Sequence, residues 1–214
     1  MSEMFLCFVQ VLMRSAMATI WDKRARLYDT FEASDLRRGP AREALFREMT
    51  GRVLFVAVGT GMDIKHFPPG REIVAIDISE EMLRRAAPRA QKYPGELRLV
   101  RADALKLCFA DESFDTVATS CTMCSVPDPQ QVFREIYRVL RPGGKLLMFE
   151  HVRSRNPVLG LTLDLMTLFT RRNGTAMNRR TVETAIAANF HITNVEPVFL
   201  DIILAVRGEK LREN

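Results

Sequence analysis

The chain has 214 residues, of which 47% are hydrophobic and 27% are charged, and its formal net charge is +5 at pH 7. This length and composition fit one folded globular domain and exclude a disordered chain. No apolar run reaches the roughly 20 residues that a membrane-spanning helix needs, and no segment repeats at a solenoid period. An ordinary membrane span and a repeat architecture are therefore excluded.

The chain opens with an apolar run at residues 4–13, which is too short to cross a membrane. Glu3 stands where a secretory signal carries positive charge, and Arg14 closes the run, so we predict no signal peptide. As a helix, this run leaves one narrow polar stripe. We expect residues 1–20 to form an apolar helix that packs on the main domain, residues 21–214, or on a membrane surface.

From residue 52 onwards, short apolar runs typical of buried strands alternate with helical patterns. Five of these runs predict neighbouring strands of one sheet, at residues 53–58, 73–76, 97–100, 114–118 and 145–149. Two late runs, 192–198 and 202–206, lie too close together for a crossover helix, so they predict an antiparallel pair at the end of the sheet. The alternation predicts a doubly wound α/β sheet, which binds ligands at the carboxyl ends of its strands.

Helix signals lie between these runs. Ser79, followed by two glutamates, predicts a capped helix start whose first turn suits the helix dipole. Asp128 before a proline predicts a second helix start. Residues 142–144, Pro-Gly-Gly, are expected to end that second helix.

Three motifs follow the predicted strands. Residues 58–61, Val-Gly-Thr-Gly, join the first strand to an expected helix, and their glycines allow a ligand to approach the backbone closely. Asp77 lies 18 residues after Gly59, at a strand end where a carboxylate can accept both hydroxyls of a ribose. Asp103 follows the third strand and can accept from an exocyclic amine. A nicotinamide-binding Gly-x-Gly-x-x-Gly motif is not complete, because Ile64 occupies its third glycine position.

Over residues 21–207 this arrangement resembles the class I S-adenosylmethionine-dependent methyltransferases, and in particular their small-molecule and lipid branch. The resemblance rests on five segments: Val53–Gly61, Ile76–Ser79, Ala102–Ala104, Ser113–Asp115 and Arg138–Gly144. It implies a Rossmann-like, mostly parallel seven-stranded sheet with an antiparallel last strand. It also implies S-adenosylmethionine as cofactor, methyl transfer as activity, and an acceptor-site insertion near residues 152–180.

The resemblance further implies which residues contact the cofactor. These are Val58, Gly59, Thr60 and Gly61 at the methionine part, Asp77 at the ribose, Ile78, Asp103 and Ala104 at the adenine, and Ser120 and Tyr28 along its sides. The chain departs from the family at two positions, because Phe55 replaces the usual acid and Ala57 the usual glycine. We expect a conventional backbone at Ala57. Both departures keep open a non-catalytic module that binds S-adenosylmethionine or lipid.

Residues 120–126, Ser-Cys-Thr-Met-Cys-Ser-Val, give information about the class of methyl acceptor. Amino-group methyltransferases of nucleic acids commonly carry Asn/Asp-Pro-Pro-aromatic there, so we expect no nucleic-acid partner. Residues 119–154 resemble bacterial phosphatidylethanolamine N-methyltransferases, quinone-biosynthesis C-methyltransferases and thiol methyltransferase-like proteins. We expect phosphatidylethanolamine N-methylation at a membrane surface, with thiol S-methylation and quinone C-methylation as alternatives.

Basic charge is concentrated in residues 151–180, which contain six arginines and one acid, a net +5 that equals the excess of the whole chain. Within this segment an apolar stretch, residues 158–169, is bracketed by pairs of arginines. Such a stretch suits an amphiphilic small-molecule or lipid acceptor, or docking on an anionic bilayer. Residues 153–172 and 4–13 are therefore the predicted membrane contacts.

An amine acceptor, with a pKa near about 10, must lose a proton before it attacks a methyl group. His151, at the end of the fifth strand, is the first candidate for the proton acceptor, followed by Tyr28 and Glu150. Cys121 and Cys124 form a single Cys-x-x-Cys pair, half a zinc site at best, so we expect no metal. Pocket thiols are one interpretation of the two, and small buried residues are the one we favour. The cysteine spacing is not that of a disulfide scaffold and predicts a reducing cytoplasm.

Overall fold

The computed structural model of the protein describes residues 17–25 and 38–212. The predictions for residues 4–13 and Tyr28 lie outside the described residues. Of the helix predicted at residues 1–20, the structure describes the last part, since residues 17–25 are helical.

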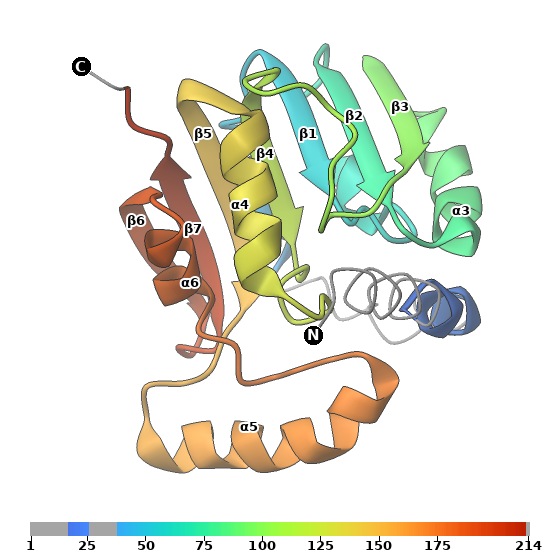
Figure 1. Ribbon diagram of the computed structural model, residues 1–214. Coiled ribbons are helices and arrows are strands. Elements are labelled where there is room, and N and C mark those ends of the chain that lie inside the picture. The colour runs from blue at the N-terminus through green and yellow to red at the C-terminus, as the bar shows by residue number, and fades with distance from the viewer. Residues whose placement is uncertain (1–16, 26–37, 213–214) are drawn as a thin grey trace, which may run out of the picture.

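Seven strands form one sheet in the order β3-β2-β1-β4-β5-β7-β6 (Figure 1). They are β1 (Arg52–Val56), β2 (Glu72–Asp77), β3 (Glu96–Arg101), β4 (Phe114–Ser120), β5 (Leu140–His151), β6 (His191–Phe199) and β7 (Ile203–Glu209). The first five are parallel, and β7 pairs antiparallel with β5 and β6. The predicted doubly wound, mostly parallel sheet with an antiparallel last strand is confirmed.

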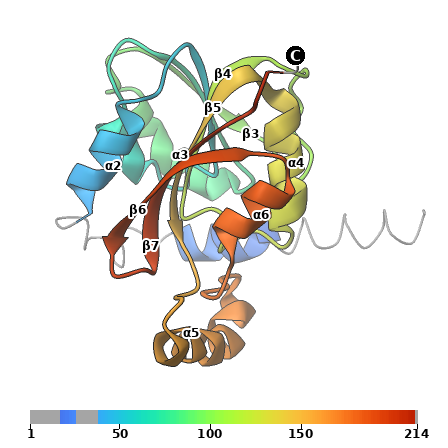
Figure 2. The same ribbon diagram turned by 90° about the vertical axis from the view of Figure 1, so that its left-hand side faces the viewer.

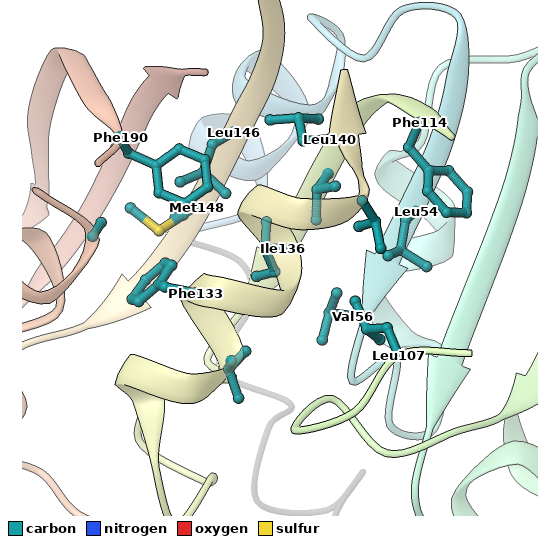
Figure 3. Packing of buried hydrophobic residues seen from close by; sticks show 14 of the residues in the cluster. Leu54, Val56, Leu107, Phe114, Phe133, Ile136, Leu140, Leu146, Met148 and Phe190 are labelled. Carbon is teal, nitrogen blue, oxygen red and sulfur yellow. The ribbon is translucent and has the colours of Figure 1, made fainter. Parts of the chain in front are cut away.

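Helices cover both faces of the sheet (Figure 2). They are α2 (Gly39–Phe46), α3 (Glu80–Ala90), α4 (Pro129–Val139) and α6 (Thr181–Ala187). A further helix, α5 (Pro157–Thr170), lies beyond the strand ends, and two 3-10 turns are η2 (Met62–His66) and η3 (Arg171–Asn173). Two apolar cores follow from this. Leu54 and Val56 of β1 face α4 and α6, whereas Val53 and Phe55 face α2. Figure 3 shows Phe133 and Ile136 of α4 in the first of these cores.

The predicted helix starts are confirmed in atomic detail. The Ser79 hydroxyl accepts a hydrogen bond from the Met82 N–H at 3.1 Å, and the Asp128 carboxylate accepts from the Gln131 N–H at 3.1 Å. Such caps satisfy backbone donors that the first helical turn leaves open. The start of α3 is thereby fixed at the same sheet edge as Asp77.

Two local predictions differ from the structure. The segment after residues 58–61 forms the five-residue 3-10 turn η2 rather than an α-helix. The helix α4 ends at Val139, and Leu140 already belongs to β5, so residues 142–144 lie inside a strand. A proline disfavours helical backbone at the residue before it, so the chain turns extended ahead of the Pro-Gly-Gly run.

Candidate functional site

A cavity lies at the carboxyl ends of β1, β2 and β4. It encloses about 800 Å³, a volume that includes its opening to solvent. Predicted binding residues that line it are Gly59, Asp77, Ile78, Asp103, Ala104 and Ser120. Its wall also includes side chains that sequence reasoning did not select as binding residues, namely Met17, Trp21, Met82, Leu105, Cys121, Ser125, Val126 and Pro127.

The turn after β1 forms one wall of the cavity. Gly59 has φ +57°, and a Cβ placed on it would meet no atom within 4 Å, so the space above its backbone is open. Gly61 has φ +81°, and a Cβ there would come within 2.8 Å of Ile64. The first glycine therefore leaves room for a ligand, while the second is required by the turn itself.

Ala57 has φ +58°, in the left-handed region that favours glycine. The expectation of a conventional backbone at this position was therefore wrong. An alanine in this conformation is strained by roughly 1–2 kcal/mol. Ala57 nevertheless lies in the cavity wall, beside Gly59.

Asp77 connects the turn after β1 to the start of α3. Its Oδ2 accepts from the Gly59 N–H at 2.8 Å, and its Oδ1 accepts from the Ser79 N–H at 2.9 Å. The side chain is buried, and burial raises the pKa of this carboxyl while the backbone hydrogen bonds oppose the rise. Each carboxylate oxygen has a second lone pair, so Asp77 can also accept hydroxyl groups from the cavity.

The helix at residues 17–25 closes this side of the cavity. The Asp22 carboxylate accepts from the Ser79 hydroxyl at 2.5 Å and from the Glu81 N–H at 3.3 Å. Trp21, one residue earlier, lies in the cavity wall. The helix is therefore fixed to the start of α3, at the end that carries Asp77.

On the opposite wall, Asp103 holds a tight turn beyond β3. Its Oδ1 accepts from the Leu105 N–H at 2.9 Å, and its backbone carbonyl accepts from the Lys106 N–H at 3.0 Å. Together with Ile78 and Ala104 it surrounds an apolar part of the cavity. A flat aromatic ring with a polar edge fits such a slot, since its faces contact apolar side chains and its edge meets a carboxylate.

The bend after β4 brings Cys121 to the cavity wall. Cys121 has φ +50° and lines the cavity, whereas Cys124 is buried, with its thiol against the Cys121 carbonyl oxygen at 3.2 Å. The interpretation as small buried residues therefore holds for Cys124 and is wrong for Cys121. Among the described residues, no three His, Cys, Asp or Glu side chains gather closely enough to hold a metal ion.

Glu150 holds the same bend through hydrogen bonds from the protein interior. It is fully buried, and its carboxylate accepts from the Thr119 hydroxyl at 2.7 Å and from the backbone N–H groups of Thr122 and Met123 at 3.1 Å each. Burial raises the pKa of Glu150 to about 7, although these hydrogen bonds lower it. Glu150, the third candidate proton acceptor, therefore positions the bend and is not among the residues that line the cavity.

His151, the first candidate, lies at the end of β5 and is partly buried. Burial lowers the pKa of His151, as does the nearby Arg38 charge, while a hydrogen bond to the Met177 backbone opposes them. The imidazole is therefore neutral at pH 7 and able to accept a proton. The cavity wall described above does not include His151.

The remaining predicted residues have other positions. Val58 and Thr60 line a smaller recess beside the main cavity, and Gly61 shapes the turn between them and η2. The helix α5 stands away from the sheet, at the edge where the strands end (Figure 1). Among the described residues, no helix is both long and apolar enough to cross a membrane.

Comparison with known proteins gives a consistent result. A family model described as a methyltransferase domain matches residues 54–148. The chain is 36% identical over 141 residues to a phosphatidylethanolamine N-methyltransferase of Cereibacter sphaeroides, which covers 64% of this chain and 69% of that protein. It is 37% identical over 119 residues to a ubiquinone/menaquinone biosynthesis C-methyltransferase of Hahella chejuensis, covering 53% of this chain and 48% of that protein.

Solved structures share the fold. An S-adenosylmethionine-dependent methyltransferase from Methanosarcina mazei superposes with a TM-score of 0.59 at 23% identity, covering 78% of this chain and 96% of that one. A second such protein, from Thermotoga maritima, gives a TM-score of 0.66 at 20% identity, covering 89% of this chain and 99% of that one. At these identities the likeness shows the fold alone.

Proposed function

The chain belongs to the S-adenosylmethionine-dependent methyltransferases, and on this basis we propose that it methylates the amine of phosphatidylethanolamine at a membrane surface. S-adenosylmethionine is its cofactor. The nitrogen acceptor is favoured by the similarity to the phosphatidylethanolamine N-methyltransferase, and the lipid by the exposed apolar face of α5.

The cavity residues fit this cofactor. The open space above Gly59 admits a ligand against the backbone, Asp77 can accept the ribose hydroxyls, and Asp103 can accept from the adenine amine. Ile78, Met82 and Leu105 offer apolar contacts to the adenine ring. We propose that these residues, with Ala104 and Ser120, hold the cofactor.

When bound, the cofactor supplies a methyl group on a positively charged sulfur. The protein must align the acceptor atom with that methyl group, at about 3–3.5 Å, and exclude water. The bend at Cys121–Cys124, held by the buried Glu150, sets the cavity wall where the acceptor has to enter. We propose His151 as the proton acceptor for the ammonium group. It lies outside the cavity wall at the end of β5, the strand next to β4, and its imidazole is neutral at pH 7.

The observation that carries the lipid proposal is the outer face of α5. Six large apolar side chains of this helix are exposed, namely Val158, Leu161, Leu165, Met166, Leu168 and Phe169. Exposed apolar patches of this kind mark interaction surfaces. Arg155 precedes the helix, Arg171 and Arg172 follow it, and all three are exposed, as at an anionic membrane surface.

The helix is also held in place by specific contacts. The Arg153 guanidinium donates to the Asp164 carboxylate at 2.8 Å, and the Asn178 amide donates to the same carboxylate at 3.0 Å. These contacts tie the middle of α5 to the chain on either side of it. The apolar face is therefore presented at a fixed position along the sheet edge that holds the cavity.

The test uses S-adenosylmethionine with a labelled methyl group and vesicles of phosphatidylethanolamine and phosphatidylglycerol. We expect label in mono- and dimethylated phosphatidylethanolamine after extraction and separation of the lipids. Asp77→Ala should abolish labelling and weaken cofactor binding at least tenfold, because a hydrogen bond to a charged group contributes about 1.5–3 kcal/mol. Glu72→Ala, at the other end of β2, is the matched control and should bind normally.

The alternative acceptors give different results. Label in added demethylated quinone, with none in phosphatidylethanolamine, would contradict N-methylation and indicate a C-methyltransferase. Label in a small thiol alone would remove the lipid from the proposal. Cofactor binding without transfer to any of these acceptors would contradict catalysis and favour a binding module.

A further inference from the structure

A second, smaller recess continues from the main cavity. Four residues belong to the walls of both, namely Ala57, Gly59, Ser120 and Cys121. The other lining residues of the recess are Arg42, Val58, Thr60, Met62 and Asp63. Of these lining residues only Arg42 and Asp63 carry charge, and they have opposite signs. The recess thus forms a small dipolar chamber beside the turn after β1.

Arg42 occupies this chamber although it is nearly buried. It lies on the same face of α2 as Leu45 and Phe46, both fully buried. Its guanidinium stacks over the ring of Phe149, 4.6 Å from the ring centre, and its Nε lies 3.4 Å from Asp63 Oδ1. The two side chains are 7% and 15% exposed.

Such a pair is a poor device for stability. Removal of two charges from water costs several kcal/mol for each ion, and hydrophobic replacements are often as stable or more stable. The contact also lacks hydrogen-bond geometry at Asp63 Oδ1. The two charges attract each other, but this buried oxygen accepts no hydrogen bond from the Arg42 Nε. An ion pair in a recess continuous with a binding cavity is better explained by a ligand that carries both charges.

Phe55, on β1 two residues before Ala57 of the recess wall, offers no charge to such a ligand. It is fully buried and packs against Phe46 and Phe67, with ring centres 5.5 and 4.8 Å away. It therefore cannot receive an ammonium group, and that charge has to be met by another residue.

We propose that Arg42 and Asp63 bind the amino-acid end of the cofactor. The Arg42 guanidinium binds the carboxylate, and the Asp63 carboxylate receives the ammonium group. Both groups already lie in one recess, so binding the zwitterion exchanges one ion pair for two complementary ones. This inference rests on the cofactor position proposed above, with the ribose at Asp77.

The test compares two ligands that differ only at this end. S-adenosylhomocysteine carries the amino-acid group, and 5′-methylthioadenosine has a methyl group in its place. Their dissociation constants are measured by calorimetry for the wild-type protein and for Arg42→Met/Asp63→Asn, which removes both charges of the pair. We expect the double variant to lose at least tenfold in affinity for S-adenosylhomocysteine and less than twofold for methylthioadenosine.

Further variants isolate the charge. Arg42→Lys keeps the charge and should recover part of the lost affinity. Arg47→Ala, at the exposed end of the same helix, should bind both ligands as the wild type does. An equal loss for both ligands, or no loss for S-adenosylhomocysteine, would overturn the inference. A wild-type protein that binds neither ligand would instead contradict the cofactor position on which the proposed function depends.

Discussion

At the scale of single residues, Glu150 links the stability of the protein to pH. Its carboxyl group is fully buried, and its pKa is about 7, against an ordinary value of 4.5. The folded state therefore binds a proton that the unfolded state has released over this interval. The stability contributed by Glu150 is fully present below pH 4.5 and is lost as the pH rises towards 7.

We expect this group to lower the free energy of unfolding by about 3 kcal/mol between pH 4.5 and 7, at 1.36 kcal/mol for each pKa unit. Urea unfolding of the wild type and of Glu150→Gln over this range measures the effect, since the variant cannot titrate there. The free energy of unfolding of the wild type, relative to that of the variant, should fall as the pH rises from 4.5 to 7. A constant difference would show that Glu150 keeps its ordinary pKa in the folded protein.

Ala57 stores strain in the turn that carries the cavity wall. Its φ of +58° suits glycine, so Ala57→Gly removes a steric penalty and adds entropy to the unfolded chain. The two effects leave a net stabilisation of up to about 1 kcal/mol. Thermal unfolding measures it, and Ala75→Gly in the buried strand β2 is the opposite control, expected to destabilise. A destabilised Ala57→Gly would mean that the alanine methyl group is needed for packing.

The same residue shows where sequence reasoning reaches its limit. Gly59, Asp77 and Asp103 could be placed at the cavity because each follows a strand whose apolar run is unmistakable. The left-handed backbone at Ala57 could not be predicted, because an alanine normally has a negative φ and only the surrounding turn imposes a positive one. Arg42 was also missed, because the fold alone brings α2 beside η2.

At the scale of elements, the inner strands β1, β2 and β5 were predictable because both faces of the sheet are covered there, so each contains a short continuous apolar run. The turn η2 was not, since five residues are too few to show a helical period. The end of α4 depended on one proline, whose effect reaches back along the chain. The short length of η2 and the backbone constraint imposed by Pro142 therefore limited these two predictions more than the amino-acid composition did.

The helix α5 shows what periodicity can leave undecided. Residues 158–169 were recognised as apolar and bracketed by arginines, but an apolar run does not say which side is covered. In the structure the inner side contains Gly160, Leu163 and Thr167, while most of the larger apolar side chains face outward. The apolar composition of this segment therefore corresponds to an exposed apolar face of α5.

We expect that surface to bind anionic membranes through its flanking arginines. Arg171→Ala/Arg172→Ala should weaken sedimentation with phosphatidylglycerol vesicles by roughly 30-fold at low salt, since each arginine near such a surface contributes about 1 kcal/mol. The loss should shrink at high salt, because exposed charges are screened. Arg47→Ala/Arg134→Ala removes two exposed charges elsewhere and should have no such effect. Equal losses in both double variants would indicate a response to net charge alone.

At the scale of the whole molecule, three features share one edge. The cavity, the helix at residues 17–25 and α5 all lie at the carboxyl ends of the parallel strands (Figure 1). Docking of α5 on a bilayer would turn that edge towards the lipid. The membrane then acts by presenting the acceptor to the cavity, rather than by changing the chemistry inside it.

This arrangement predicts that membrane binding and methyl transfer can be separated. With phosphatidylethanolamine in anionic vesicles, Arg171→Ala/Arg172→Ala should lower the rate of labelling by about as much as it lowers vesicle binding. With a short-chain phosphatidylethanolamine dissolved as monomers, the variant and the wild type should react at the same rate, because docking is no longer needed and neither arginine lines the cavity. A slower reaction of the variant with the dissolved lipid would place these arginines in acceptor binding itself, and α5 would then be part of the active site rather than its membrane anchor.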